Sequence, residues 1–263
     1  MSILKKLSLL LLLISIALTI IYLIIRWHYE PEHTVTTEIK HPGDIISIGI
    51  IGDSYVEKQT LDTIFFNAML RHNVKTKIYS FGEGGANSRL VYKNLFSDKS
   101  DPFSSNKLFH NNITYCIVIA GVNDALGQYG SKFYVYHELL IIKSLLKNNI
   151  RPVVVSLPEF GIQEEVEVRF NAFKHARNAI FGFFTGNGFK RTIHDYRNAL
   201  NIELNKQHLK DSIVFINYDY VINNYNLQKN LFRNPPHLNL AGNQRLGSYL
   251  AKCIINDIHR KGN

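Results

Sequence analysis

Five short apolar segments, separated by stretches with helical spacing, constrain the fold of this chain more than any other feature. The first of them, residues 45–51, has the nearly continuous apolar character of a strand that is buried on both faces. The five segments cover residues 45–51, 75–81, 114–120, 151–157 and 212–217. Strands that alternate with helices predict right-handed crossovers and a parallel sheet covered by helices. The sequence therefore predicts an α/β fold, a three-layer α/β/α sandwich around a central, mostly parallel five-stranded sheet.

The segments between these strands have the spacing of amphipathic helices. Apolar residues recur at helical intervals around residues 61–70, 90–95 and 134–147, and at every fourth position within 240–258. The connection between the fourth and fifth strands is longer than one helix requires and contains the cluster Phe181–Phe184. We expect this cluster either to pack between two core helices or to form a lid.

A separate apolar segment lies near the N-terminus. Residues 7–25 contain no charge, and at 1.5 Å per residue a helix of this length spans about 28 Å, roughly the hydrocarbon thickness of a bilayer. Lys5 and Lys6 precede it, and positive charge before an apolar segment favours a cytoplasmic location, so residues 1–6 are expected to form a cytoplasmic N-terminus. We predict a single transmembrane signal anchor, a linker over residues 26–44 and an extracytoplasmic domain over residues 45–263. A cleavable signal peptide is the alternative, but no small-residue cleavage site follows the apolar segment.

Charge and cysteine content narrow the function classes only slightly. The net charge of +9 becomes +6 once Lys5, Lys6 and Arg26 are set aside. That charge suits an anionic polymer or a membrane surface, and it also suits a lysine- and asparagine-rich proteome. No basic segment interleaved with aromatic residues indicates nucleic-acid binding. We expect Cys116 and Cys253 to be free thiols that face the core.

The first three predicted strands each end in a short polar segment. These segments read GDSY from Gly52, GEGGANS from Gly82 and GVND from Gly121. The carboxyl ends of parallel strands meet at one edge of the sheet, so the three segments are expected to converge. Ser54 is then a candidate nucleophile at a helix N-terminus, and His237, which follows two prolines, is a candidate base. Each has a plainer alternative, since Ser54 also suits a helix cap and a lone histidine in a loop is often incidental.

The order of these segments resembles the SGNH/GDSL hydrolase family from residue 45 to the C-terminus. The four sequence blocks of that family are matched by GDSY, GEGGAN, GVND and the segment Pro236–Asn239. The resemblance implies a flavodoxin-like sandwich in which Ser54 attacks an ester carbonyl and His237 acts as general base. It also implies an oxyanion hole formed by the backbone N–H groups of Ser54 and Gly85 and the side-chain amide of Asn123. Asp53 and Asp124 are expected to hold the loops rather than to take part in the chemistry.

One position departs from the family pattern. The family has an aspartate three residues before the histidine, whereas this chain has Asn234. Three interpretations follow: a Ser54–His237 dyad oriented by Asn234 or a main-chain carbonyl, an acid supplied from elsewhere such as Asp219, or a catalytically silent site that binds a glycan. The amide oxygen of Asn234 can accept the Nδ1 proton of the histidine but brings no negative charge.

Four functions are compatible with this site. We expect a membrane-anchored, extracytoplasmic serine esterase that removes acetyl or other small acyl groups from a cell-envelope or exported polysaccharide. The alternatives are an O-acyltransferase that uses the same serine, a lipolytic enzyme with a lid at Phe181–Phe184, and a non-catalytic glycan-binding or assembly protein. Neither H-E-x-x-H nor C-x-x-C occurs, so we predict no metal site and no cofactor. The oligomeric state, the acyl group and the glycan stay open.

Overall fold

The structure is a computed structural model of the whole chain. It describes residues 3–33, 45–58, 60–168, 172, 176, 180 and 193–262. The Phe181–Phe184 cluster, and with it the choice between core and lid, lies outside these residues. So does most of the predicted linker, from residue 34 to residue 44.

A five-stranded sheet forms the centre of the domain, and every neighbouring pair of strands in it is parallel. The strand order is β2-β1-β3-β4-β5, the order of flavodoxin-like sheets, which confirms the predicted fold class. The observed strands lie within a residue or two of the predicted ones at most ends. Their bounds are β1 (Ile46–Gly52), β2 (Thr76–Gly82), β3 (Tyr115–Ile119), β4 (Arg151–Val155) and β5 (Val214–Ile216).

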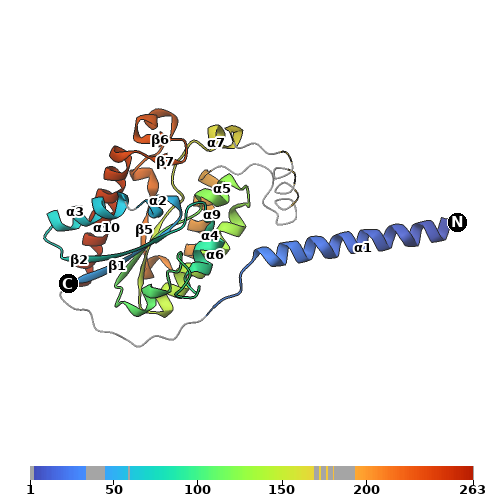
Figure 1. Cartoon of the computed structure of the whole chain (residues 1–263), viewed down its shortest axis with the longest axis horizontal. Helices are drawn as coiled ribbons and strands as arrows, with labels where there is room; N and C mark the ends of the chain where they lie inside the picture. Colours follow the sequence, from blue (N-terminus) through green and yellow to red (C-terminus); the bar gives the residue numbers. More distant parts are fainter. Residues whose placement is uncertain are drawn as a thin grey trace.

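Helices cover both faces of this sheet (Figure 1). Helices α3 (Thr60–Arg71) and α10 (Leu240–Gly262) pack against each other on one face. The other face carries α4 (Ser88–Asn94), α6 (Ser131–Lys147) and α9 (Ile193–Lys206), of which α6 contacts both of the others. The remaining short elements are α2 (Ser54–Glu57), η1 (Asn106–His110), α5 (Val122–Leu126), α7 (Ile162–Val168), η2 (Lys210–Ser212), η3 (Tyr218–Tyr220), η4 (Asn226–Leu231), β6 (Phe232–Asn234) and β7 (His237–Leu238).

The buried apolar side chains form two core clusters. In β3, Ile117 and Ile119 belong to the cluster that contains residues of α3, α6, α9 and α10, while Cys116 and Val118 belong to the cluster that contains residues of α4 and α6. All four side chains are fully buried. Both cysteines are free thiols, as predicted, although Cys253 is only half-buried. A parallel strand that is buried on both faces needs apolar residues at every position, which is why the sequence of β3 is continuously apolar.

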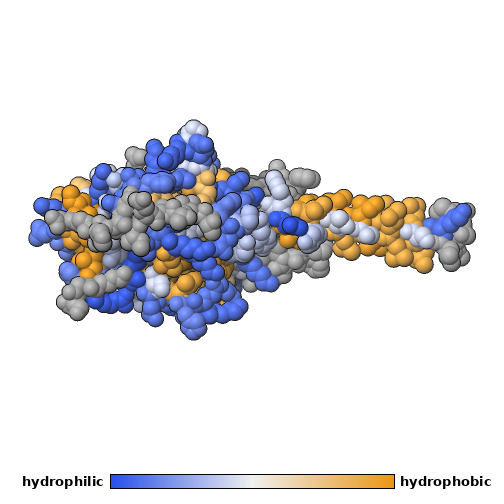
Figure 2. All heavy atoms as spheres, turned by 90° about the horizontal axis from the view of Figure 1, so that it is seen from below, coloured by the Kyte–Doolittle hydropathy of each residue, from blue (hydrophilic) through white to orange (hydrophobic). Residues whose placement is uncertain are grey.

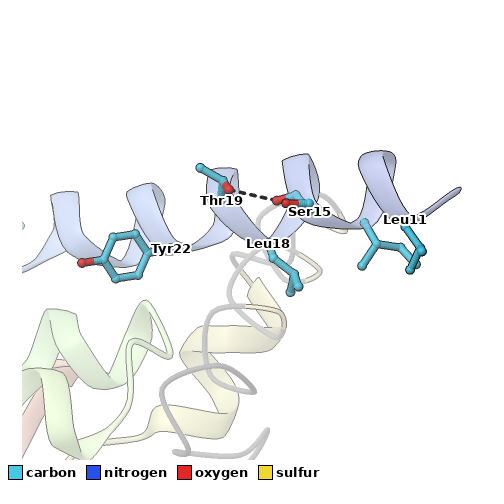
Figure 3. Close-up of a pocket in the computed structure, with 6 residues that line it drawn as sticks. Leu11, Ser15, Leu18, Thr19 and Tyr22 are labelled. Carbon is cyan, nitrogen blue, oxygen red and sulfur yellow. Dashed lines mark hydrogen bonds between the residues drawn. The ribbon is translucent and has the colours of Figure 1, made fainter. Parts of the chain in front are cut away.

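The N-terminal helix α1 (Ile3–His28) projects away from the domain (Figure 1). Its segment Lys5–Trp27 is long and apolar enough to cross a membrane, a property that signal sequences share, and none of its most apolar stretch is buried by the rest of the chain. Figure 2 shows an apolar surface along most of this helix. The hydroxyl of Thr19 donates to the carbonyl oxygen of Ser15 one turn earlier (Figure 3), which satisfies a polar group without water.

Residues 29–33, which follow α1, pack on the domain instead of extending freely from it. The Tyr29 ring stacks on His137 and contacts Phe133 and Tyr136, all three from α6. The carboxylate of Glu30 pairs with Arg89 of α4 at 2.5 Å. This part of the predicted linker therefore holds the end of α1 against helices α4 and α6.

Candidate active site

Ser54 is the first residue of α2, directly after β1 and the buried Asp53. The Asp53 side chain caps this short helix by accepting a hydrogen bond from the Tyr55 N–H at 3.0 Å. Helix α2 can approach the end of β2 because Gly82 has no side chain, since a Cβ there would lie 2.2 Å from the Glu57 nitrogen. The Ser54 hydroxyl is thus presented, half-buried, at the carboxyl edge of the sheet.

His237 comes from the opposite end of the chain, on a small hairpin. Strands β6 and β7 are antiparallel, with Asn234 opposite His237 and two prolines between them that restrict the turn. The Nε2 atom of His237 lies 3.0 Å from Ser54 Oγ. Its Nδ1 atom lies 2.7 Å from Asn234 Oδ1. The structure thus brings the three residues together in one line of hydrogen bonds.

This line defines the proton positions of the histidine. Asn234 Oδ1 can only accept, so Nδ1 of His237 carries the proton and donates it. The neutral imidazole then has its lone pair at Nε2, where it accepts the hydroxyl proton of Ser54. That tautomer is the one a general base requires.

The residues expected to form the oxyanion hole lie around the same edge. Gly85 has a φ of +81°, and a Cβ on it would meet no atom within 4 Å, so the space beside its Cα is open. Within the described residues, neither the Ser54 nor the Gly85 N–H is engaged by an acceptor. The amide of Asn123 donates to the Ala86 carbonyl oxygen at 2.9 Å and makes a longer contact of 3.4 Å with Asp53 Oδ2. The contact with Asp53 is the weaker of the two, because its length is near the limit for a hydrogen bond.

Two buried carboxylates hold these loops, as expected from the sequence. Asp124 accepts from both the N–H and the hydroxyl of Ser88, which ties the third polar segment to the second. Burial raises the pKa of Asp124 to about 6. Burial also raises the pKa of Asp53 to about 7; the Tyr55 N–H opposes this shift and the negative charge of Asp124 adds to it.

The other candidate acid is engaged elsewhere. Asp219 follows β5 in η3 and pairs with Arg197 of α9. It is exposed, and the Nδ1 atom of His237 already has Asn234 as its partner. The geometry therefore favours a dyad oriented by Asn234 over a triad completed by Asp219.

A cavity of about 210 Å³ opens beside the serine and the histidine. It is lined by ten residues from α2, the start of α3, the β6–β7 hairpin and the start of α10, namely Ser54, Tyr55, Lys58, Thr60, Arg233, His237, Leu238, Asn239, Leu240 and Asn243. Two of them, Lys58 and Arg233, are cations that the sequence analysis did not single out. Their positions in the sequence could have indicated that they lie near the site, because Lys58 follows Ser54 by one helical turn and Arg233 is next to Asn234. In the part of the chain that the structure describes, no group of three or more His, Cys, Asp or Glu residues could hold a metal ion.

Comparison with known proteins identifies the fold. No family model matches the sequence, and no curated protein matches it. Among solved structures, a Clostridium thermocellum family 3 carbohydrate esterase is similar with a TM-score of 0.55 and 14% identity, covering 83% of this chain and 100% of that one. An acetyl xylan esterase has a TM-score of 0.53 and 16% identity, covering 81% and 100%. A member of the lipolytic protein G-D-S-L family from Veillonella parvula has a TM-score of 0.53 and 12% identity, covering 80% and 98%.

At these identities the likeness is one of architecture. The similar structures are covered almost from end to end, and each similarity accounts for about four-fifths of this chain. The chain therefore has the fold of the SGNH/GDSL hydrolases.

Proposed function

We propose that the protein is a serine esterase that works through an acyl-Ser54 intermediate. The observation that carries the proposal is the hydrogen-bonded line from Ser54 Oγ through His237 to Asn234 Oδ1, with distances of 3.0 and 2.7 Å. A hydroxyl that donates to an oriented neutral imidazole is the arrangement that activates a serine as a nucleophile.

In the first half of the reaction, Ser54 Oγ attacks the ester carbonyl carbon as its proton passes to His237 Nε2. The carbonyl oxygen becomes an oxyanion, which the N–H groups of Ser54 and Gly85 and the amide of Asn123 would stabilise. The tetrahedral intermediate then collapses: the bond to the leaving oxygen breaks, and the proton on Nε2 moves to that oxygen. Free alcohol and acyl-Ser54 result.

In the second half, a water molecule takes the place of the alcohol. His237 Nε2 accepts a proton from the water as its oxygen attacks the acyl carbon, and a second oxyanion forms at the same donors. Its collapse breaks the bond to Ser54 Oγ, which recovers its proton from Nε2. The products are a carboxylic acid and the free enzyme.

Asn234 stabilises the protonated form of His237 less than an aspartate would. The asparagine oxygen orients the ring through Nδ1 but carries no charge that favours the protonated form. A hydrogen bond to a charged group contributes about 1.5–3 kcal/mol, against about 0.5–1.5 kcal/mol between neutral groups. We therefore propose a working but slower enzyme, rather than an inactive one.

We propose acetyl or other small acyl groups on a cell-envelope or exported polysaccharide as the substrate class. Two of the similar structures are described as a carbohydrate esterase and an acetyl xylan esterase, which supports an acylated carbohydrate. The apolar helix α1 supports a location at the membrane, with the domain on the extracytoplasmic side.

A fluorophosphonate probe tests the nucleophile directly in the full chain, purified in detergent. The probe phosphonylates an activated serine and releases fluoride. We expect labelling of the wild type, no labelling of Ser54→Ala, and unchanged labelling of Ser100→Ala, which changes an exposed serine that does not line the cavity. Hydrolysis of p-nitrophenyl acetate should follow the same pattern. An unlabelled but folded wild type would point instead to a glycan-binding protein.

A further inference from the structure

The cavity beside Ser54 and His237 has a distinctive charge. Its ten lining residues include two cations, Lys58 and Arg233, and no carboxylate. Both cations are exposed, so each can reach a ligand in the cavity without a change in the fold. A cavity with this lining attracts negative charge.

Neither cation is neutralised by a carboxylate within the described residues. No ion pair forms there at Lys58 or at Arg233, whereas Lys229, four residues before Arg233, pairs with Glu164. Lys229 in η4 is thus matched inside the protein, while Arg233 in the neighbouring strand β6 is left for another partner.

The acidic residues nearest in sequence face away from the cavity. The carboxylate of Glu57 lies against the second polar segment, where a Cβ on Gly84 would be 2.6 Å from Glu57 Oε2. Asp62 interacts with Ser80 of β2. The polar neighbours are also occupied: Asn239 and Asn243 donate their side-chain amides to backbone carbonyl oxygens. Among the described residues, Lys58 and Arg233 are therefore the charged side chains of this cavity that have no ion-pair partner.

The mechanism indicates which half of an ester would enter the cavity. His237 Nε2 must give its proton to the leaving oxygen, so the alcohol portion lies beside His237. The oxyanion instead points to Gly85 and Asn123, neither of which lines the cavity. The cavity is therefore on the alcohol side of the scissile bond.

We propose that Lys58 and Arg233 bind an anionic group, a carboxylate or a phosphate, on the alcohol portion of the ester, so that the substrate is an acylated acidic polymer. This inference rests on the proposed function and narrows its substrate class. Arginine pairs with the planar oxygens of either anion in a bidentate manner, and lysine adds a point charge.

Matched substrates test the inference. An O-acetylated oligogalacturonide is compared with the same oligosaccharide after conversion of its carboxylates to primary amides, with the full chain in detergent at low salt. We expect a higher kcat/KM for the anionic substrate, mainly through a lower KM.

The preference for the anionic substrate should fall about two- to fivefold for each of Lys58→Gln and Arg233→Gln, the range of an exposed ion pair. It should persist in Lys107→Gln, an exposed lysine in η1, and should shrink at 0.5 M salt. An O-acetylated glycerol phosphate oligomer, assayed in parallel, distinguishes a phosphate preference from a carboxylate preference.

A binding experiment tests the subsite without turnover. Calorimetry with Ser54→Ala and the deacetylated oligogalacturonide measures affinity for the alcohol portion. We expect binding that weakens when Lys58→Gln and Arg233→Gln are added and that is absent for the amidated oligosaccharide.

Equal hydrolysis of neutral and anionic esters would overturn the subsite and leave the proposed esterase activity intact. Hydrolysis of neither, with cation-dependent binding retained, would overturn the esterase and leave the subsite. Binding that ignores both the amidation and the two substitutions would overturn the subsite whatever the activity.

Discussion

His237 Nδ1 lies 2.7 Å from Asn234 Oδ1, so an uncharged amide occupies the position that an aspartate holds in the family pattern. The hairpin of β6 and β7 sets this contact by pairing the two residues across its turn. Asn234 thus orients the imidazole ring but supplies no negative charge to stabilise its protonated form. Substitutions of Asn234 can therefore test the effect of orientation separately from the effect of charge.

Restoring the charge should speed the reaction. We expect Asn234→Asp to hydrolyse p-nitrophenyl acetate as fast as the wild type or up to about tenfold faster, because a charged hydrogen bond exceeds a neutral one by about 1 kcal/mol or more. Asn234→Ala should be slower, since nothing then orients Nδ1. In serine proteases the change from aspartate to asparagine lowers kcat by about 10⁴. We take that factor as the largest difference to expect here, because the natural residue of this site is already asparagine. Loss of activity in Asn234→Asp would show that the amide has a role of its own.

Removal of the Asn123 amide should lower kcat far more than it raises KM. One oxyanion donor is worth about 10²–10³ in kcat, so Asn123→Ala is expected to lose activity to that degree. Asn205→Ala, in an exposed position of α9, is the matched control and should keep full activity. Steady-state kinetics with a short acetyl ester, together with circular dichroism, separates lost catalysis from lost folding. A loss of less than about threefold would remove Asn123 from the oxyanion hole.

Glu138 should make the protein less stable as the pH rises. Its two carboxylate oxygens are buried with no hydrogen-bond partner in the described part of the chain, and burial, with a smaller effect from Asp124, raises its pKa from 4.5 to about 8. The folded state therefore keeps a proton that the unfolded state releases near pH 4.5. Stability is then present at low pH and falls between about pH 4.5 and 8, by up to about 1.4 kcal/mol per pH unit.

Glu138→Gln should reduce that slope and leave the protein equally or more stable at pH 8. Asp53 and Asp124, whose pKa values are also raised, keep part of the dependence between about pH 4 and 7. Urea unfolding at a series of pH values measures the slope, and Glu203→Gln, in a partly exposed position of α9, serves as the control. An unchanged slope in Glu138→Gln would show that this carboxyl titrates normally.

The segment after α1 should contribute to the stability of the whole domain. Tyr29 packs on three aromatic rings of α6, so Tyr29→Ala is expected to destabilise the full chain by about 1–3 kcal/mol. Trp27→Ala is the matched control, because Trp27 is 72% exposed, and should have a smaller effect. Thermal unfolding in detergent, followed by circular dichroism, measures the difference. Equal effects of the two substitutions would mean that residues 29–33 do not pack on the domain in solution.

Most of the fold could be predicted because its central strands, β1, β3 and β4, are almost completely buried. Such strands produce apolar segments that differ clearly from amphipathic helices, and β1 and β3 fall close to their predicted bounds. The ends were less predictable: α10 continues to Gly262, beyond its apolar repeat, and β5 has three residues where six were expected. The length of β5 depends on which of its residues pair with β4, and this pairing covers only Val153–Val155 of β4.

The sequence by itself determined the alternation of strands and helices, the apolar N-terminal segment, and the four polar blocks with Ser54 and His237 in the first and last. Only the tertiary structure decided that Nε2 of His237 reaches Ser54, that Asn234 and not Asp219 meets Nδ1, and that Lys58 and Arg233 share a cavity. The physical reason is the distance along the chain between the residues that interact. Hydrophobic periodicity is local and can be read along the chain, whereas contacts between residues 183 positions apart depend on how the sheet and the hairpin pack together.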